Sequence, residues 1–158
     1  MNNMRINVRW MAETALLSTL ITVTGAIKIP GLVPGTEFQL SAPLAVAICA
    51  VFGFTKYITA GILSSIAGLV LGTQNLLNIS IALIFRLTVG IVLGCFGTAW
   101  PVVVIAGPLG STAARLALAV MLGKAAIPLL VAAIPGMVYT TLAAWPLTQI
   151  LKRCKTKT

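Results

Sequence analysis

The sequence has very little negative charge and no histidine. Of its 158 residues only 2 are acidic, against 11 Lys and Arg, and charged residues make up 8% of the chain. A soluble domain carries roughly a quarter charged residues. Without histidine or paired carboxylates at helical spacing, metal hydrolysis and acyl transfer lack the side chains that carry them. We therefore expect a protein that is not an enzyme and that holds no metal or cofactor.

Other familiar motifs are also missing. The glycine-containing stretches GLVPGTEF and MLGKAA lack the spacing of a phosphate-binding P-loop, so we expect no ATP hydrolysis by this chain alone. The 3 cysteines lie far apart and show neither a disulfide framework nor metal-ligand spacing. The net charge of +9 comes mostly from basic residues that flank apolar runs, which is typical of anchoring at a membrane surface and not of nucleic-acid binding.

Hydrophobic residues are abundant, at 59% of the chain with a mean hydropathy of +1.06. A helix that crosses a bilayer needs about 20 mostly apolar residues, and several runs approach that length. We predict an all-α membrane protein whose residues 1–158 form one integral membrane domain, a compact bundle in a prokaryotic plasma membrane. The six predicted transmembrane helices cover approximately residues 9–27, 39–55, 57–73, 77–96, 99–122 and 126–150.

The basic residues predict the orientation of this bundle. With both termini in the cytoplasm, the outer side carries only Lys28 and Lys124. The positive-inside rule therefore predicts an N-in, C-in topology and argues against a dual-topology exporter, whose flanks would be nearly balanced. The inner side then carries Arg5, Arg9, Lys56, Lys152, Arg153, Lys155 and Lys157.

One arginine, Arg86, lies near the centre of the apolar stretch NISIALIFRLTVGIVLG. A guanidinium keeps its proton, so a chain that buries one must supply a carboxylate, a phosphate, carbonyls or water. Gly90 and Gly94 share a helical face with Arg86, and small residues let helices approach closely in lipid. We therefore expect the Arg86 face to be turned to protein. The preceding span carries a similar stripe of small residues, Gly61, Ser65, Gly68 and Gly72.

A second arginine, Arg115, follows Pro108 in the stretch AWPVVVIAGPLGSTAARLALAVMLGK. Pro108 lacks a backbone donor, so we expect a kink or a break in this helix. At about 1.5 Å per residue, both arginines lie roughly 12–14 Å below the outer end of the bundle. Two like charges at one depth repel each other unless an anion or a carboxylate lies between them.

The two acids of the chain are Glu13 and Glu37. Glu13 is expected to pair with Arg9, one helical turn earlier. Glu37 lies in the predicted outer loop KIPGLVPGTEFQLSAP, which we expect to fold over an outward-facing cavity. The predicted substrate site comprises Arg86 and Arg115, with Glu37 and Gln39 from this loop, Asn75 and Asn78 at the mouth of the fourth span, and Tyr139 in the sixth.

The residue types of this site indicate its ligand. Arginine forks match a carboxylate or a phosphate, so we predict a small organic anion such as a vitamin acid or its precursor. The alternative for each arginine is a structural role, in which the guanidinium binds helix carbonyls or extends along its own stem to the membrane surface.

The chain resembles the S components of energy-coupling factor (ECF) transporters, the substrate-binding membrane subunits for vitamins and related micronutrients. The resemblance covers nearly the whole chain and is carried by the first helix in MRINVRWMAETALLSTLITV, the long loop KIPGLVPGTEFQLSAP and the two short helices in LAVAICAVFGFTKYITAGILSSIAGLVLG. It implies two cytoplasmic ATPases and a separate transmembrane coupling subunit as partners, in addition to membrane lipid. It also implies that the S component topples in the membrane to carry substrate inward.

The first helix departs from this family in one respect. Many S components carry A-x-x-x-A there for docking on the coupling subunit, whereas this chain has Ala12 and Ala15 followed by Thr19, a looser pair of small residues. Two other functions remain open from the sequence. A small secondary transporter or channel would work without ATP, and a structural membrane subunit would use both arginines to bind protein groups.

Overall fold

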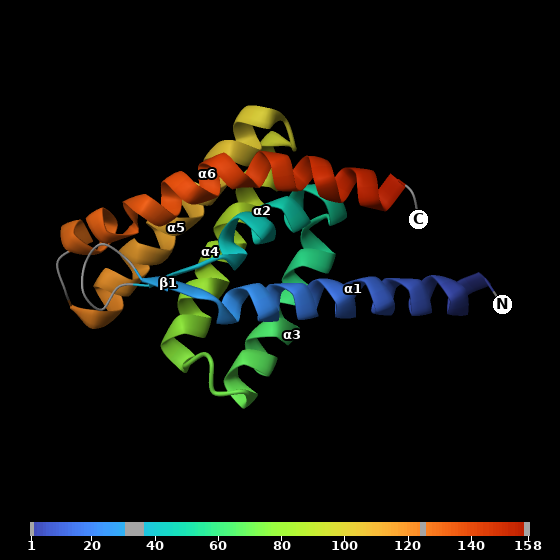
Figure 1. The fold of residues 1–158 in the computed structure, drawn as a ribbon, viewed down its shortest axis with the longest axis horizontal. Coiled ribbons are helices and arrows are strands. Elements are labelled where there is room, and N and C mark those ends of the chain that lie inside the picture. The colour runs from blue at the N-terminus through green and yellow to red at the C-terminus, as the bar shows by residue number, and fades with distance from the viewer. Residues whose placement is uncertain (1, 31–36, 124–125, 157–158) are drawn as a thin grey trace.

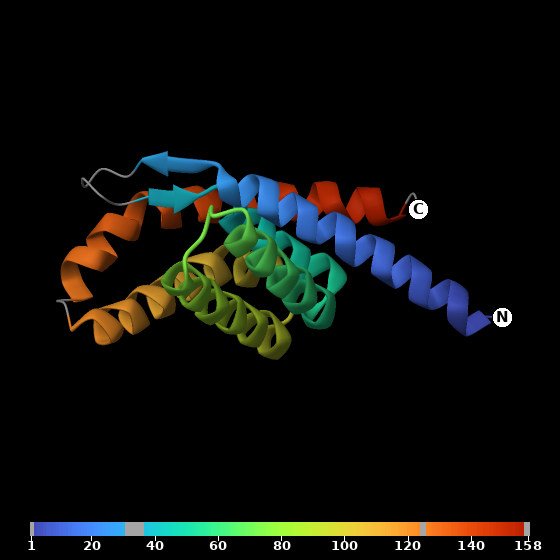
Figure 2. The ribbon, with the colours of Figure 1, turned by 90° about the horizontal axis from the view of Figure 1, so that it is seen from below.

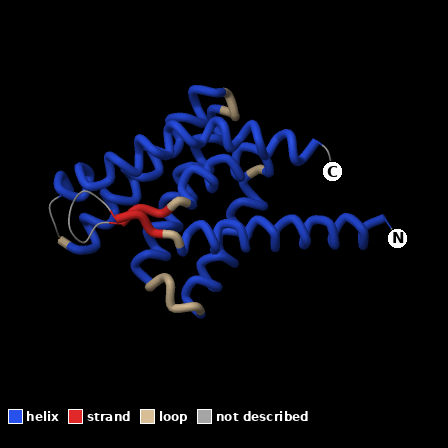
Figure 3. Tube along the Cα trace, viewed as in Figure 1, coloured by secondary structure: helices blue, strands red, loops and turns tan. Residues whose placement is uncertain are grey.

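Six helices and one short β-hairpin make up the fold (Figures 1 and 3). The computed structural model describes residues 2–30, 37–123 and 126–156. The six predicted segments all correspond to helices, and the predicted outer loop contains two short antiparallel strands. The elements are α1 (Asn2–Ala26), β1 (Lys28–Pro30), β2 (Glu37–Gln39), α2 (Ser41–Phe52), α3 (Phe54–Val70), α4 (Leu76–Phe96), α5 (Trp100–Leu122) and α6 (Ala126–Thr156).

Three of the helices are long and apolar enough to cross a membrane: Leu76–Phe96, Trp100–Met121 and Ile127–Thr156. Helices α2 and α3 are apolar but shorter. The 12 residues of α2 extend about 18 Å, well short of the roughly 30 Å of a bilayer core. The helical membrane protein predicted from the sequence is therefore confirmed with three clear spans, while the six-span, N-in topology stays a prediction.

Helix α2 lies inside the bundle and not at its surface. Its central residues Val46, Ala47 and Ile48 are fully buried, and it packs against α6, α1 and α3. A helix that is apolar on every side is stable only when other helices or lipid surround it. The all-round apolar sequence of this segment thus reflects burial within protein, which explains how so short a helix can belong to a membrane bundle.

Gly53 joins α2 to α3 with a φ of 85°, in the region that side chains other than glycine rarely adopt. The predicted spans 39–55 and 57–73 put the junction near Lys56, whereas Lys56 lies in the first turn of α3, which begins at Phe54. The predicted break at Pro108 is also absent, because α5 runs as one helix from Trp100 to Leu122. Pro108 removes the helical donor to the Val104 carbonyl, and membrane helices tolerate such a loss. One turn later the Thr112 hydroxyl donates to the Pro108 carbonyl at 2.9 Å.

The bundle has two distinct ends, which Figure 2 shows side on. The β-hairpin lies at one end with the close of α5 and the start of α6, and we call it the hairpin end. Both chain termini lie at the other, which we call the terminal end. Helices α4 and α5 run in opposite directions and pack closely, and α5 and α6 also pack closely.

Large apolar side chains also cover the outside of the bundle. A soluble monomer rarely exposes a contiguous apolar patch of more than a few hundred Å². Exposed apolar residues here occur on α3, α4, α5 and α6, in keeping with lipid-facing helices. They include Ile62, Ile66, Val70, Ile91, Ile105, Val120 and Leu142.

Candidate functional site

A cavity of about 190 Å³ lies within the bundle and is lined by residues of α1, α2, α4, α5 and α6. This volume is below the roughly 300–1,000 Å³ of sites for drug-sized ligands, so the cavity suits a small molecule. Its walls are mainly apolar, with Ile21, Ile81 and Phe85 as the largest apolar groups. Its polar residues are Ser41, Asn78, Arg86, Ser111, Arg115 and Thr140.

The cavity follows directly from helical spacing. On α4, Asn78, Ala82 and Arg86 recur at intervals of four residues and therefore share one face. On α5, Ser111 and Arg115 are likewise one turn apart. Small residues on the facing helices, such as Ala45, Ala133 and Gly136, leave the space between these faces open.

Arg86 is buried, with 5% of its surface exposed, as the sequence predicted for a face turned to protein. Its Nη1 donates a hydrogen bond to the Ser65 hydroxyl on α3 at 2.7 Å. Its side chain also crosses Gly61 so closely that a Cβ at that position would lie 2.5 Å from Nε. Gly61 and Ser65 thus form a seat on α3 that holds the Arg86 side chain, and we call these two residues the α3 seat.

Arg115 reaches the same cavity from α5 and is only partly buried. It has no hydrogen-bond or ion-pair partner within residues 8–27 and 40–121, whose side chains the structure describes almost completely. Its guanidinium is therefore presented to the cavity without the hydroxyl partner that Arg86 has.

The packing of α4 on α5 gives the relative heights of the two arginines. Gly110 of α5 lies against Phe85 and Val89 of α4. Because the two helices run in opposite directions, each residue forward along α5 corresponds to one residue back along α4. Five residues beyond Gly110, the backbone of Arg115 is therefore level with about Ala82, one turn or roughly 6 Å nearer the start of α4 than Arg86. Helical side chains lean toward the N-terminus of their own helix, so these two lean toward each other. Both side chains thus enter the same cavity, from levels about one helical turn apart.

The described lining of the cavity contains two arginines and no Asp or Glu. In a largely apolar enclosure, two nearby positive charges repel strongly and are poorly solvated. An anion between them removes both penalties, and a guanidinium offers a carboxylate or phosphate a planar fork of donors. The described lining is therefore chemically suited to an anionic group.

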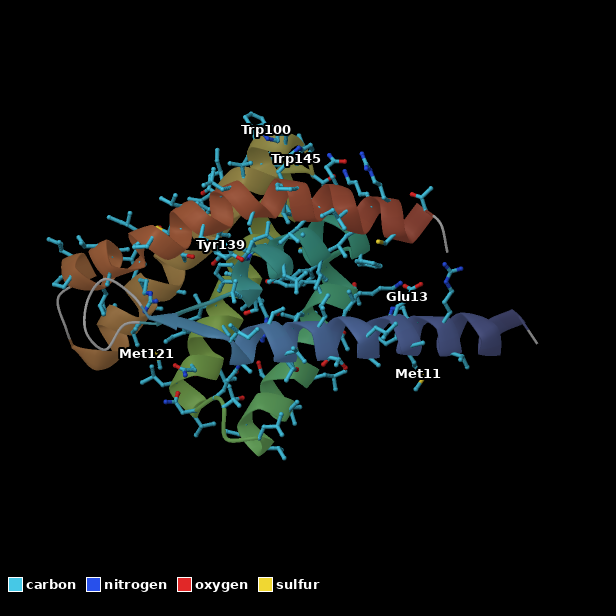
Figure 4. The ribbon with its side chains drawn as sticks, in the orientation of Figure 1. Met11, Glu13, Trp100, Met121, Tyr139 and Trp145 are labelled. Carbon is cyan, nitrogen blue, oxygen red and sulfur yellow. The ribbon has the colours of Figure 1, made fainter. Side chains whose placement is uncertain are left out.

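The other predicted site residues fall into three groups. Asn78 lines the cavity, whereas Asn75 is exposed at the start of α4, where its Oδ1 accepts a hydrogen bond from the Asn78 backbone N–H at 2.8 Å. Tyr139 extends from α6 (Figure 4) and does not line the cavity, although the next residue, Thr140, does. Glu37 and Gln39 lie in β2, and their side chains are outside the described part of the structure.

Several cavity residues were missed from the sequence, among them Ser41, Phe85, Ser111 and Thr140. A signal existed for Ser111, because it lies one helical turn before Arg115 on the same face. No comparable signal marks Ser41 or Thr140. Their positions depend on how α2 and α6 rotate about their axes, which hydroxyl residues in an apolar helix do not reveal.

The predicted docking residues of α1 lie on its surface. Ala12, Ala15 and Thr19 are all exposed, and the Thr19 hydroxyl is bonded to the Ala15 carbonyl of its own helix at 3.0 Å. A hydroxyl satisfied in this way leaves a small and nearly apolar surface. These three positions therefore present a shallow face on which another helix can pack closely.

Glu13 forms the predicted ion pair with Arg9, with 3.0 Å between Oε1 and Nε. It also pairs with Lys56 of α3, an interaction that the sequence did not reveal. Figure 4 shows Glu13 and Met11 on opposite sides of α1, with Met11 on the exposed side. Glu13 thus joins α1 to α3 at the terminal end, away from the cavity.

Comparison with known proteins finds one strong similarity. The chain is 53% identical to protein BioX of Lysinibacillus sphaericus over 141 residues, which cover 89% of this chain and 85% of that protein. No family model matches the sequence, and no solved structure matches it significantly.

Proposed function

We propose that this chain, which belongs to the family of protein BioX, is the substrate-binding membrane subunit of an ECF-type importer. In this role it captures a small organic anion, a vitamin acid or a related micronutrient, from outside the cell. One observation carries the proposal: two arginines line a small cavity whose described walls contain no acidic residue. Such a cavity binds anions strongly and gains most when the ligand neutralises its charge.

The proposed partners are a transmembrane coupling subunit and two cytoplasmic ATPases. The exposed face of Ala12, Ala15 and Thr19 on α1 supports this part of the proposal, because small residues allow close helix packing in lipid. A chain with no P-loop depends on such partners for ATP-driven uptake. Substrate then moves inward when ATP hydrolysis reorients the subunit in the membrane.

Reconstitution in liposomes tests this proposal. The purified chain, alone and with the coupling subunit and ATPases of its host, is given a panel of water-soluble vitamins and their acidic precursors. We expect ligand binding by the chain alone and accumulation only with the whole complex and ATP. Accumulation by the chain alone, driven by an ion gradient, would establish a secondary transporter and overturn the proposal.

A bulky substitution on α1 separates docking from capture. Ala15→Phe places a large side chain on the exposed face, where it prevents close approach of a partner helix. Ligand affinity of the isolated chain should be unchanged, while copurification with the coupling subunit should fail. Leu16→Phe, an exposed apolar position one residue away, is the matched control. Equal copurification of both variants would place the docking surface elsewhere.

A further inference from the structure

We propose that the ligand of this cavity carries two carboxylates joined by a short apolar chain, and that Arg86 and Arg115 each bind one of them. This inference rests on the proposed capture of an anion and narrows its chemical class. Three features of the described residues support it: the number of uncompensated charges, the direction from which each approaches, and the apolar wall between them.

The two arginines of the cavity indicate how many charges the ligand carries. A monocarboxylate would neutralise one arginine and leave the other positive beside largely apolar walls. Ser65 supplies a hydroxyl, which carries no charge, and the other described polar groups of the lining are also neutral. Two negative charges on the ligand are required to bring the cavity to neutrality.

The two guanidinium groups also approach from different sides. Helix α4 packs between α3 and α5 (Figure 1), and the Arg86 side chain is held toward α3 by Gly61 and Ser65. Arg115 comes from α5, on the other side of α4. A seat on α3 keeps Arg86 from moving over to share a single anionic group with Arg115. Two separate anionic groups therefore fit the site better than one.

The wall between these charges is apolar. Ala82 and Phe85 of α4, with Ala114 of α5, line the cavity between the levels of the two arginines. Methylene groups bury favourably against such a surface, by about 0.8 kcal/mol for each CH₂. An unbranched chain with a carboxylate at each end combines these requirements within a small volume.

Binding of a homologous series tests the proposal. Purified chain in detergent is titrated with straight-chain dicarboxylates from succinate to sebacate, with the monocarboxylates of equal length and with alkyl phosphates. We expect one chain length to bind best, and its dicarboxylate to bind about tenfold to a hundredfold more tightly than the matching monocarboxylate. Equal affinity for the monocarboxylate, or for an alkyl phosphate, would overturn the inference and leave anion capture standing.

Two substitutions assign the carboxylates. In Arg115→Gln, which changes a partly exposed residue and should fold, the advantage of the dicarboxylate over the monocarboxylate should fall to nearly nothing. The same loss in Arg86→Gln would assign the second carboxylate. A preference for dicarboxylates that persists in Arg115→Gln would show that Arg115 does not bind the second group.

Glu37 provides the decisive control, because the sequence predicts that it approaches the arginines. If its carboxylate neutralised one of them, the natural ligand would carry a single charge. Glu37→Gln should leave the ratio of dicarboxylate to monocarboxylate affinity unchanged. A ratio that rises about tenfold or more in this variant would overturn the proposal in favour of a monoanionic ligand. Failure of the proposed function is distinguishable, because a neutral or cationic vitamin would then bind while every carboxylate did not.

Discussion

Positive charges at the terminal end and in the cavity have different partners. At the terminal end, Glu13 of α1 pairs with both Arg9 and Lys56. Lys155 of α6 donates to the Val51 carbonyl at 2.8 Å, with its ammonium 5.3 Å from the centre of the Phe52 ring. In the cavity, by contrast, Arg86 has one hydroxyl partner and Arg115 has none in the described part of the chain.

This difference separates structural charge from functional charge. The terminal-end cations bind a carboxylate, a carbonyl and an aromatic ring of the protein. They join α1 to α3 and α6 to the last turn of α2. Ser65 binds Arg86, but no described carboxylate neutralises either cavity arginine. Under the proposed function, these two charges bind the anionic ligand. We therefore expect substitutions around the cavity to change ligand affinity, and substitutions at the terminal end to change only stability.

Gly61→Ala should have the largest effect, because its new Cβ would overlap the Arg86 side chain at 2.5–2.9 Å. Arg86 would have to leave the α3 seat, and ligand affinity should fall about a hundredfold, the equivalent of roughly 2.8 kcal/mol. Stability should change little, since alanine favours a helix over glycine by about 0.5–1 kcal/mol and offsets part of the strain. Isothermal titration with the best ligand, together with thermal unfolding, measures both quantities.

Gly94→Ala is the matched control for this substitution. Gly94 lies inside α4, and a Cβ there would meet nothing within 4 Å. Helix propensity then predicts a small gain in stability and unchanged affinity. Equal ligand affinities for Gly61→Ala and Gly94→Ala would mean that the position of Arg86 does not affect ligand binding. The proposed difference between the cavity and the terminal end would then be wrong.

Ser65→Ala should have an intermediate effect. It removes the hydroxyl that binds Arg86 but leaves the space for the side chain intact. Hydrogen bonds to charged groups contribute about 1.5–3 kcal/mol, so affinity should fall about tenfold, with some rescue by Ser65→Thr if its extra methyl fits. Ser80→Ala is the control, because the Ser80 hydroxyl bonds the Leu76 carbonyl of its own helix. A tenfold loss in the control, with none in Ser65→Ala, would contradict the role of the seat.

The sequence predicted those features that depend on local pattern. Runs of apolar residues located all six helices, and Arg86 and Gly90 face protein as predicted. Gly94, predicted on the same face, is exposed because it lies near the end of α4, beyond the packed part of the helix. The stripe of Gly61 and Ser65 was visible as well, but not its contact with Arg86. That contact depends on how α3 is rotated against α4. Helical periodicity within one segment does not predict this rotation.

Other features could not be predicted for related reasons. The length of the apolar run suggested that α2 is a span, whereas the burial of most of its residues depends on which helices surround it. Tyr139 and Thr140 are neighbours on α6, and only the rotation of that helix decides that Thr140 lines the cavity. The pair of Glu13 and Lys56 joins residues 43 positions apart, beyond the reach of any rule for a single helix.

Glu13→Gln should have the smallest effect on ligand affinity. It tests whether the charges of the terminal end serve stability alone. The substitution keeps the shape of the side chain but removes the charge that Arg9 and Lys56 share. These groups are partly exposed, with 25% of the Glu13 side chain accessible, so we expect a loss of stability of only about 1 kcal/mol. The loss should shrink in high salt, because exposed pairs are screened.

Affinity for the best ligand should stay within about twofold of the parent chain, since a change of that size is well below 1 kcal/mol. Thermal unfolding at low and high salt measures the first effect, and titration with the same ligand measures the second. A large fall in affinity with unchanged stability would show that the cation cluster of the terminal end controls the cavity, and the division between structural and functional charge would then be wrong.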